Sequence, residues 1–275
     1  MTVEATPVGN LLRTWRQRRR LSQLALACDA EISQRHLSFL ESGRALPSRE
    51  MILHLAEQLD VPLRDRNALL VAAGFAPIYR ERPLGDPELQ AARKAVDLVL
   101  KGHEPYPALA VDRHWTLVAA NRAVSQLLTG AAPELLRPPV NVLRLSLHPA
   151  GLAPRIINLA EWRAHVVARL SRQVELSADP ALADLLSELR KYPAGRNCRH
   201  ATGPGEFAGV VVPLRLASPS GVLSFFSTTT VFGTPVDITL SELAIESFFP
   251  ADAATADIMR RFPEARAAPA DPRAS

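Results

Sequence analysis

The chain has 275 residues, of which 47% are hydrophobic and 22% are charged, and these fractions exclude a largely disordered protein. This length allows one large domain or two modest ones. The formal net charge is only +4, and the two cysteines, Cys28 and Cys198, lie far apart, so neither a disulfide framework nor a structural zinc site is expected. Residues 1–10 have neither the basic nor the apolar region of a signal peptide, and no apolar run approaches ~18 residues. We therefore expect a cytoplasmic protein without a membrane partner.

The positive charge is concentrated near the N-terminus. Residues 11–20 carry five arginines and no acidic residue. Such a run is typical of a surface that contacts nucleic acid, but a solvated helix face explains it equally well.

The first 75 residues predict five short helices. Leu11, Leu12 and Trp15 form an apolar stripe at helical spacing, which indicates the first helix. A serine suited to the N-cap position begins each of the next three helices. These serines are Ser22, Ser33 and Ser48. Pro62, a residue suited to a first helical turn, begins a fifth helix that ends near Gly74.

The second and third helices have the pattern of a helix-turn-helix, in which the third helix enters the major groove of DNA. Residues 28–31 form the expected turn, and Leu37 and Leu40 anchor the third helix. Glutamine can hydrogen-bond adenine, and arginine can bind guanine through two hydrogen bonds. The outer face of the third helix comprises Gln34, Arg35, Ser38 and Phe39.

Residues around this motif are expected to contact DNA phosphates. Gln23 begins the second helix, where its amide and the helix-terminal N–H groups can jointly hold a phosphate. The arginines placed to neutralise the DNA backbone are Arg13, Arg18, Arg19 and Arg44. A double-stranded DNA operator is therefore the expected macromolecular partner.

Residues 8–75 resemble the lambda-repressor-like, or XRE-type, helix-turn-helix family. The resemblance rests on residues in the family's order and spacing, namely Leu21-Ser22-Gln23, Ser33, Leu37, Leu40-Glu41-Ser42-Gly43 and Pro47-Ser48. It implies base contacts from Gln34, Arg35 and Ser38. It also implies an inward ion pair between Arg16 and Glu41. Phe39 departs from the family pattern, which often has a polar residue here; its ring either contacts a thymine methyl group or packs against a neighbouring helix.

The composition changes after residue 75. Residues 77–86 contain proline and mixed charges and form an expected linker. Helices are predicted at residues 87–101, 121–128, 158–177 and 180–191. Short strands are predicted at residues 108–112 and 117–120, and a three-stranded antiparallel meander at residues 209–216, 222–230 and 237–248. The tail after residue 262 is expected to be disordered.

Three segments, residues 66–84, 103–123 and 141–149, resemble the MmyB-like subfamily, which joins the XRE-type head to a PAS-like ligand-binding domain. The resemblance implies a multidomain protein. By this resemblance we expect an all-α five-helix DNA-binding domain at residues 1–76, followed by an α/β PAS-like ligand-binding and dimerisation domain at residues 87–262. The second domain is expected to have a curved antiparallel sheet with helices on one side of an apolar pocket. The implied ligand is small, hydrophobic and fatty-acid-like.

Candidate pocket residues lie on one predicted helix and two predicted strands. Trp162, Val166 and Leu170 share one helix face, and Phe226 and Phe248 are placed to face them from the sheet. A stripe of this kind also suits a plain core, so the pocket rests on the resemblance. No cofactor or metal is expected.

No enzyme is expected. Asp179 and Asp184 lack a partner base, the cysteine and histidine of residues 198–200 lack an orienting group, and residues 203–205 form a turn and not a phosphate loop. A single recognition helix reads few base pairs, so we expect a homodimer. The expected function is that of a DNA-binding transcription regulator modulated by a ligand.

Two alternatives remain open at this point. In one, the protein is a constitutive dimeric repressor whose second domain only mediates dimerisation. In the other, the second domain modifies a small molecule. An apolar cavity of roughly 300 Å³ or more would favour the sensor, and a cleft with convergent polar groups would favour the enzyme.

Overall fold

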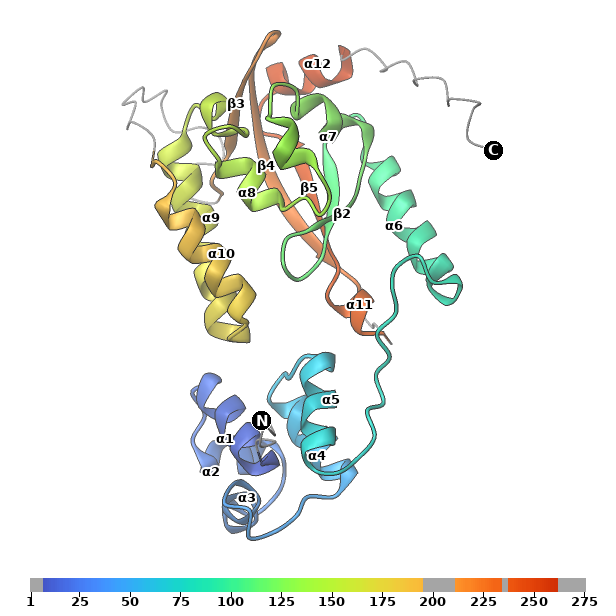
Figure 1. Ribbon diagram of the computed structural model, residues 1–275, viewed down its shortest axis with the longest axis vertical. Helices are drawn as coiled ribbons and strands as arrows, with labels where there is room; N and C mark the ends of the chain where they lie inside the picture. The colour runs from blue at the N-terminus through green and yellow to red at the C-terminus, as the bar shows by residue number, and fades with distance from the viewer. Residues whose placement is uncertain (1–6, 195–210, 234–236, 262–275) are drawn as a thin grey trace. The chain divides into compact units, whose positions relative to one another are not determined.

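The structure is a computed structural model that describes residues 7–194, 211–233 and 237–261. The chain divides into two compact units, whose elements are labelled in Figure 1. The head unit comprises Met1–Ala92, Arg172–Ala178 and Phe232–Leu243. The sheet unit comprises Arg93–Ser171, Asp179–Val231 and Ala244–Ser275. The predicted fold class, an all-α head followed by an α/β domain, is confirmed.

The head has the five predicted helices. They are α1 (Val8–Arg18), α2 (Gln23–Asp29), α3 (Gln34–Glu41), α4 (Arg49–Gln58) and α5 (Leu63–Ala72). The side chains of Ser22, Ser33 and Ser48 each accept a hydrogen bond from the backbone N–H three residues later, which satisfies a group that the helix start leaves unpaired. The turn was expected at residues 28–31, but α2 extends to Asp29, and the chain turns through Glu31 at a φ of 52°.

The head has its own hydrophobic core. Leu12 and Trp15 of α1 and Leu37 and Leu40 of α3 are buried together with apolar side chains of α2, α4 and α5. Gly9 permits a close approach of α1 to α3, because a Cβ atom there would lie 2.4 Å from the carbonyl oxygen of Leu40. These contacts hold α3 in the head through its buried side chains, Leu37 and Leu40.

Residues 77–86, the expected linker, are held by the head. The Asn67 side chain of α5 accepts hydrogen bonds from the backbone N–H groups of Ile78 and Tyr79 at 3.0 and 3.1 Å, and it donates to the Tyr79 carbonyl oxygen at 2.7 Å. Arg80 forms a β-bridge with Asp237. The segment therefore has a defined path along the head unit.

A five-stranded antiparallel sheet in the order β2-β1-β5-β4-β3 forms the centre of the sheet unit. The strands are β1 (Ala108–Val111), β2 (Leu117–Ala120), β3 (Leu214–Ser218), β4 (Gly221–Val231) and β5 (Ala244–Pro250). The predicted short strands and the meander are present. The third meander strand is shorter than predicted, because Asp237 caps a short helix, α11 (Ile238–Ser241). The first meander strand begins at Leu214 and ends at Ser218, later than predicted. Residues 211–213 are not in a strand, and residues 209 and 210 lie outside the described residues.

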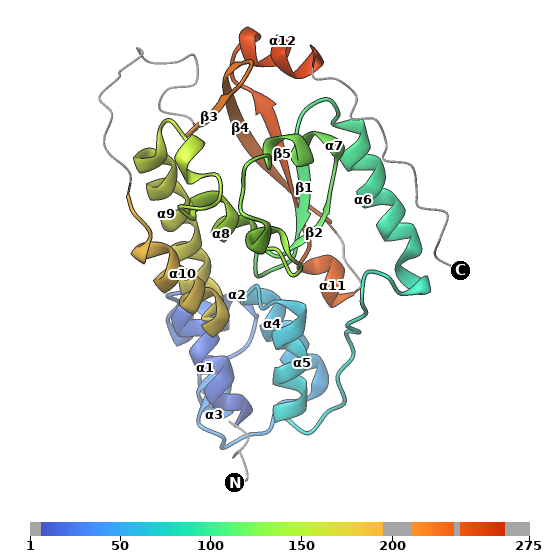
Figure 2. The same cartoon turned by 45° about the horizontal axis from the view of Figure 1, so that its top comes forward.

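Helices lie on both faces of the sheet, whereas the resemblance implied one face (Figure 2). The face that includes Leu109, Glu246 and Phe248 is covered by α7 (Arg122–Leu127), α8 (Val142–Leu147), α9 (Leu159–Ser177) and α10 (Pro180–Lys191). The other face is covered by α6 (Gln90–Gly102) and α12 (Ala253–Arg261). His103, just after α6, contacts the Phe249 ring, and Thr255 of α12 accepts a hydrogen bond from the Ser224 backbone. Neither α8 nor α12 was predicted. Short 3-10 helices lie at η1 (Pro87–Leu89), η2 (Pro133–Leu136) and η3 (Ala153–Arg155).

Candidate DNA-binding face and ligand cavity

The recognition helix α3 presents a polar outer face. Gln34 and Arg35 are exposed in its first turn, and Ser38 is half-buried one turn later. On the inner side, Leu37 and Leu40 are 0% and 1% exposed. Because these leucines are fixed in the core, the outer side chains project from a rigid helix, which is the arrangement that reads a major groove.

Phe39 packs against two of the arginines expected to contact DNA. Its ring is half-buried, and the guanidinium carbons of Arg35 and Arg44 lie 5.3 and 5.9 Å from the ring centroid. The face of an aromatic ring attracts a guanidinium group through its quadrupole. The Phe39 ring therefore packs on arginines, one on its own helix and one just after it, and contact with a thymine methyl group stays a prediction. The spacing of Arg35 one helical turn before Phe39 was the sequence signal for this contact.

The ion pair between Arg16 and Glu41 is present and buried. Arg16 donates from Nε to Oε1 of Glu41 at 2.6 Å and from Nη2 to Oε2 at 2.8 Å. The two side chains are 10% and 3% exposed. Gln23, expected to contact a phosphate, donates its side-chain amide to Oε2 of Glu41 at 2.9 Å. The amide of Gln23 thus has a structural role that the sequence analysis did not predict.

These hydrogen bonds keep the Glu41 carboxylate charged inside the head. Burial is the largest single influence and acts to raise the pKa of Glu41. The hydrogen bonds from Arg16 and Gln23, together with the charge of Arg16, outweigh it, so the pKa is lowered from its ordinary value. One charged carboxylate therefore ties α1 and α2 to the end of the recognition helix.

The four arginines expected to contact DNA phosphates differ in how many contacts they make within the head. Arg13 and Arg44 are exposed. Arg18 and Arg19 are half-buried, and their guanidinium carbons lie 4.9 and 5.6 Å from the Trp15 ring centroid. Arg19 also donates to two backbone carbonyl oxygens just after α4. Arg13 and Arg44 are therefore the more accessible candidates for phosphate contacts.

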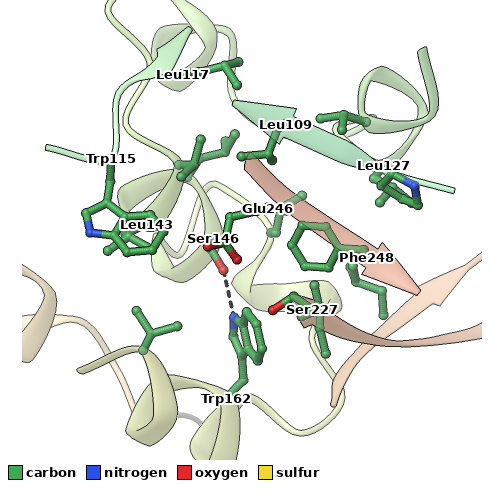
Figure 3. Close-up of a pocket in the computed structure, with 18 of the residues that line it drawn as sticks. Leu109, Trp115, Leu117, Leu127, Leu143, Ser146, Trp162, Ser227, Glu246 and Phe248 are labelled. Carbon is green, nitrogen blue, oxygen red and sulfur yellow. Dashed lines mark hydrogen bonds between the residues drawn. The ribbon is translucent and has the colours of Figure 1, made fainter. Parts of the chain in front are cut away.

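An apolar cavity of about 110 Å³ lies in the sheet unit (Figure 3). Its walls include Leu109 of β1, Leu143 and Leu145 of α8, Trp162 and Val166 of α9, and Phe248 of β5. The indole N–H of Trp162 donates to the hydroxyl oxygen of Ser146 at 3.0 Å. Apolar walls with a few polar groups are typical of small-molecule sites.

Three of the five expected pocket residues, Trp162, Val166 and Phe248, line this cavity. Leu170 does not belong to its described lining and is fully buried one turn further along α9. The helix face that carries Trp162 and Val166 continues past the cavity, and Leu170 is part of the solid core beyond it.

Phe226 was expected in the pocket and lies instead on the opposite face of the sheet. Its ring stacks on Phe249 with centroids 5.4 Å apart. Successive residues of a strand point to opposite faces, so its neighbour Ser227, which pairs with Phe248, reaches the cavity. The expectation for Phe226 was therefore wrong by one residue of register.

The cavity is smaller than the volume of roughly 300 Å³ that would favour a ligand sensor. Its 110 Å³ is closer to the ~150 Å³ of an apolar protein cavity that binds benzene. As it stands it fits a compact apolar molecule, and a long acyl chain requires it to widen.

An ion pair between a partly exposed arginine and a buried glutamate lines the cavity. Arg169 of α9 donates to both carboxylate oxygens of Glu246 of β5, at 2.6 and 3.2 Å. The Thr229 hydroxyl accepts from Arg169 and donates to Glu246, each at 2.8 Å. The Arg169 guanidinium carbon lies 4.6 Å from the Trp115 ring centroid. This cluster was not predicted from the sequence.

The acids considered for catalysis have structural surroundings. Asp179 caps α10, and its Oδ2 lies at hydrogen-bond distance, 2.9 Å, from Nε2 of His114. Asp184 is exposed on the same helix. Residues 198–200 and 203–205 lie outside the described residues. Within the described ranges, no group of three His, Cys, Asp or Glu side chains is placed to hold a metal ion. No helix of these ranges is long and apolar enough to cross a membrane.

Two family models match the chain. The helix-turn-helix domain matches residues 7–69, which contain every expected DNA contact. The MmyB-like transcription regulator ligand binding domain matches residues 92–262, which contain the cavity and more than half of the chain. No curated protein shows a significant match. The chain therefore belongs to the MmyB-like family of helix-turn-helix DNA-binding transcription regulators.

Proposed function

We propose that the protein is a sequence-specific transcription regulator whose DNA affinity changes when a small hydrophobic, fatty-acid-like molecule occupies the cavity. The observation that supports this most is the apolar cavity inside the matched ligand-binding domain. A ligand shifts a two-state protein only through its differential affinity for the states, which is typically about 1–3 kcal/mol. Burial of four methylene groups contributes about 3 kcal/mol, so a small apolar ligand suffices if it is buried in only one of the two states.

In this proposal, Gln34 and Arg35 read bases and Ser38 lies beside them on α3. Arg13 and Arg44 hold phosphates from exposed positions, with Arg18 supported on Trp15. Gln23 supports DNA binding in two ways: its amide hydrogen-bonds Glu41 at the end of α3, and it contacts a phosphate at the start of α2. The partner is a double-stranded DNA operator.

The connection between β4 and β5 supports a link from the cavity to the head. Both strands contribute lining residues, among them Ser227 and Glu246, and the connecting residues 232–243 belong to the head unit. Within that unit, Arg64 of α5 donates to both carboxylate oxygens of Glu242, at 2.8 and 3.0 Å, and to Glu81. The chain that joins these two lining strands is therefore bound to a head helix at Glu242.

We further propose that the protein acts as a homodimer. A few base pairs read by one α3 do not specify a site, whereas two heads related by a two-fold axis read two half-sites. Leu98 and Val99 on α6 are 70% and 44% exposed and offer apolar area for a second copy to cover.

The small cavity favours one alternative, a constitutive dimeric repressor whose sheet unit only dimerises. Native mass spectrometry of the full-length protein separates the two functions. The sensor predicts a dimer of the 30.0 kDa chain that carries or takes up a small lipophile. A dimer that takes up no lipophile from a panel of alcohols, esters and medium-chain acids would contradict the sensor and support the constitutive repressor.

A further inference from the structure

We infer that Glu246 makes the cavity select uncharged ligands over carboxylates, so that the molecule it senses is a neutral lipophile such as an alcohol, ester or amide. This inference rests on the proposed function, because it names the chemical class that the same cavity binds. It narrows the fatty-acid-like expectation to molecules that have an acyl-like chain and an uncharged polar group.

The charges in the cavity wall cancel. Among the described residues that line the cavity, those of the Lys, Arg, Asp and Glu types are Arg169 and Glu246. They bind each other through two hydrogen bonds. The Thr229 hydroxyl bridges the same two groups. The cation that would otherwise attract a ligand carboxylate is therefore already neutralised.

The two partners differ in their access to water. The side chain of Glu246 is 5% exposed and that of Arg169 is 31% exposed. A ligand carboxylate that binds Arg169 either displaces Glu246, which leaves a buried carboxylate without its cation, or shares the guanidinium with Glu246, which places two negative charges side by side. Both consequences are strongly unfavourable. Glu246, the more buried partner, is therefore the residue that excludes anions.

A neutral polar group meets no such penalty. Ser146 and Ser227 both line the cavity, and their labelled side chains lie around its centre with Glu246 (Figure 3). Ser146 accepts the hydrogen bond from Trp162 and can donate its own hydroxyl hydrogen to a ligand oxygen. An alcohol or ester can use these hydroxyls while the ion pair stays intact.

The test compares 1-octanol with octanoate on the full-length protein by isothermal titration calorimetry. The wild type should bind 1-octanol at least tenfold more tightly than octanoate. Glu246→Gln frees the Arg169 charge and should shift the ratio of the two dissociation constants at least tenfold toward octanoate. Comparing variants cancels the different hydration of the two ligands. Measurements at pH 6.0 and 8.5 separate any effect of His165, which also lines the cavity.

Two further variants control the result. Glu188→Gln makes the same change in the Arg144–Glu188 pair, which is not part of the cavity lining, and should leave the ratio within twofold of wild type. The double variant Arg169→Gln/Glu246→Gln keeps the wall neutral and should restore the preference for 1-octanol.

The outcomes distinguish this inference from the proposed function. Equal or tighter binding of octanoate by the wild type overturns the inference, and that result needs no variant to fold. An unchanged ratio in folded Glu246→Gln overturns it as well. If the wild type binds neither molecule, and no other lipophile, the proposed sensing function itself fails.

Discussion

Replacement of Glu41 by alanine should destabilise the head strongly. The change removes a carboxylate that accepts two hydrogen bonds from Arg16 and one from Gln23. Arg16 keeps its hydrogen bond to the Leu21 carbonyl oxygen, but its charge is left buried. Removal of one partner of a buried pair costs roughly 3–5 kcal/mol. A helical head of this length has a total stability of roughly 3–10 kcal/mol, so most of it should be lost.

Hydrogen exchange followed by mass spectrometry on the full-length protein measures this effect in the head separately from the rest of the chain. A loss of 3–5 kcal/mol corresponds to exchange in α1–α3 that is roughly two to four orders of magnitude faster. The control is Glu188→Ala, which breaks the Arg144–Glu188 pair, whose side chains are 40% and 36% exposed. Exposed pairs contribute about 0–1 kcal/mol. If exchange in α1–α3 of Glu41→Ala accelerates less than tenfold, the buried-pair reasoning is refuted.

The same pair predicts a loss of stability in acid. Glu41 has a lower pKa in the folded head than its ordinary value, so the unfolded chain binds more protons between the two values and stability rises with pH there. The contribution is fully present above the unfolded-state pKa of about 4.3 and is lost as the pH falls through the lowered folded-state value. Denaturant melts from pH 3 to 6 should show a flatter dependence for Glu41→Gln; an identical slope would contradict the assignment.

The remaining predictions concern DNA. Gln34→Ala and Arg35→Ala should each cost about 1–3 kcal/mol at an operator selected from random duplexes and relax the preference at one base pair; unchanged preference in the double variant would rule out these base contacts. Arg44→Ala should weaken operator and random DNA alike and make the salt dependence of log K shallower by about one, and a loss confined to the operator would disagree. Phe39→Ala should reduce operator affinity because Arg35 and Arg44 lose their shared support, and wild-type footprints would show that this support is dispensable.

The head was largely predictable because its signals are local. Ser22, Ser33 and Ser48 are N-cap residues that indicate where three helices begin. The leucines of α3 repeat at helical spacing and indicate its buried face. The recognition helix could therefore be located from residues close to it in the sequence. What the sequence did not predict was the competition for side chains inside the head. Gln23 lies at the start of α2, where its amide could contact a phosphate, but the amide also donates a hydrogen bond to the buried Glu41 carboxylate. Only the folded structure shows this hydrogen bond.

The cavity was only partly predictable because its wall joins distant segments. The face of α9 that carries Trp162 and Val166 follows from helical periodicity, but where the cavity ends along that face depends on α8, which was not predicted. Phe226 and Ser227 show a second reason: in a strand whose aromatic residues occupy both faces, pattern alone does not assign the face, and pairing with β5 decides it. The Arg169–Glu246 pair spans 77 residues of sequence, which no local pattern reveals.

Operator titration with and without 1-octanol tests the central claim most directly. Fluorescence anisotropy at fixed salt measures the operator dissociation constant of wild type and of Val166→Asp, which places a charge in the cavity wall. The sensor predicts that a saturating lipophile changes the wild-type constant at least fivefold and leaves the variant's constant unchanged. A wild-type constant that stays within twofold, at concentrations where calorimetry shows the cavity occupied, would contradict the account.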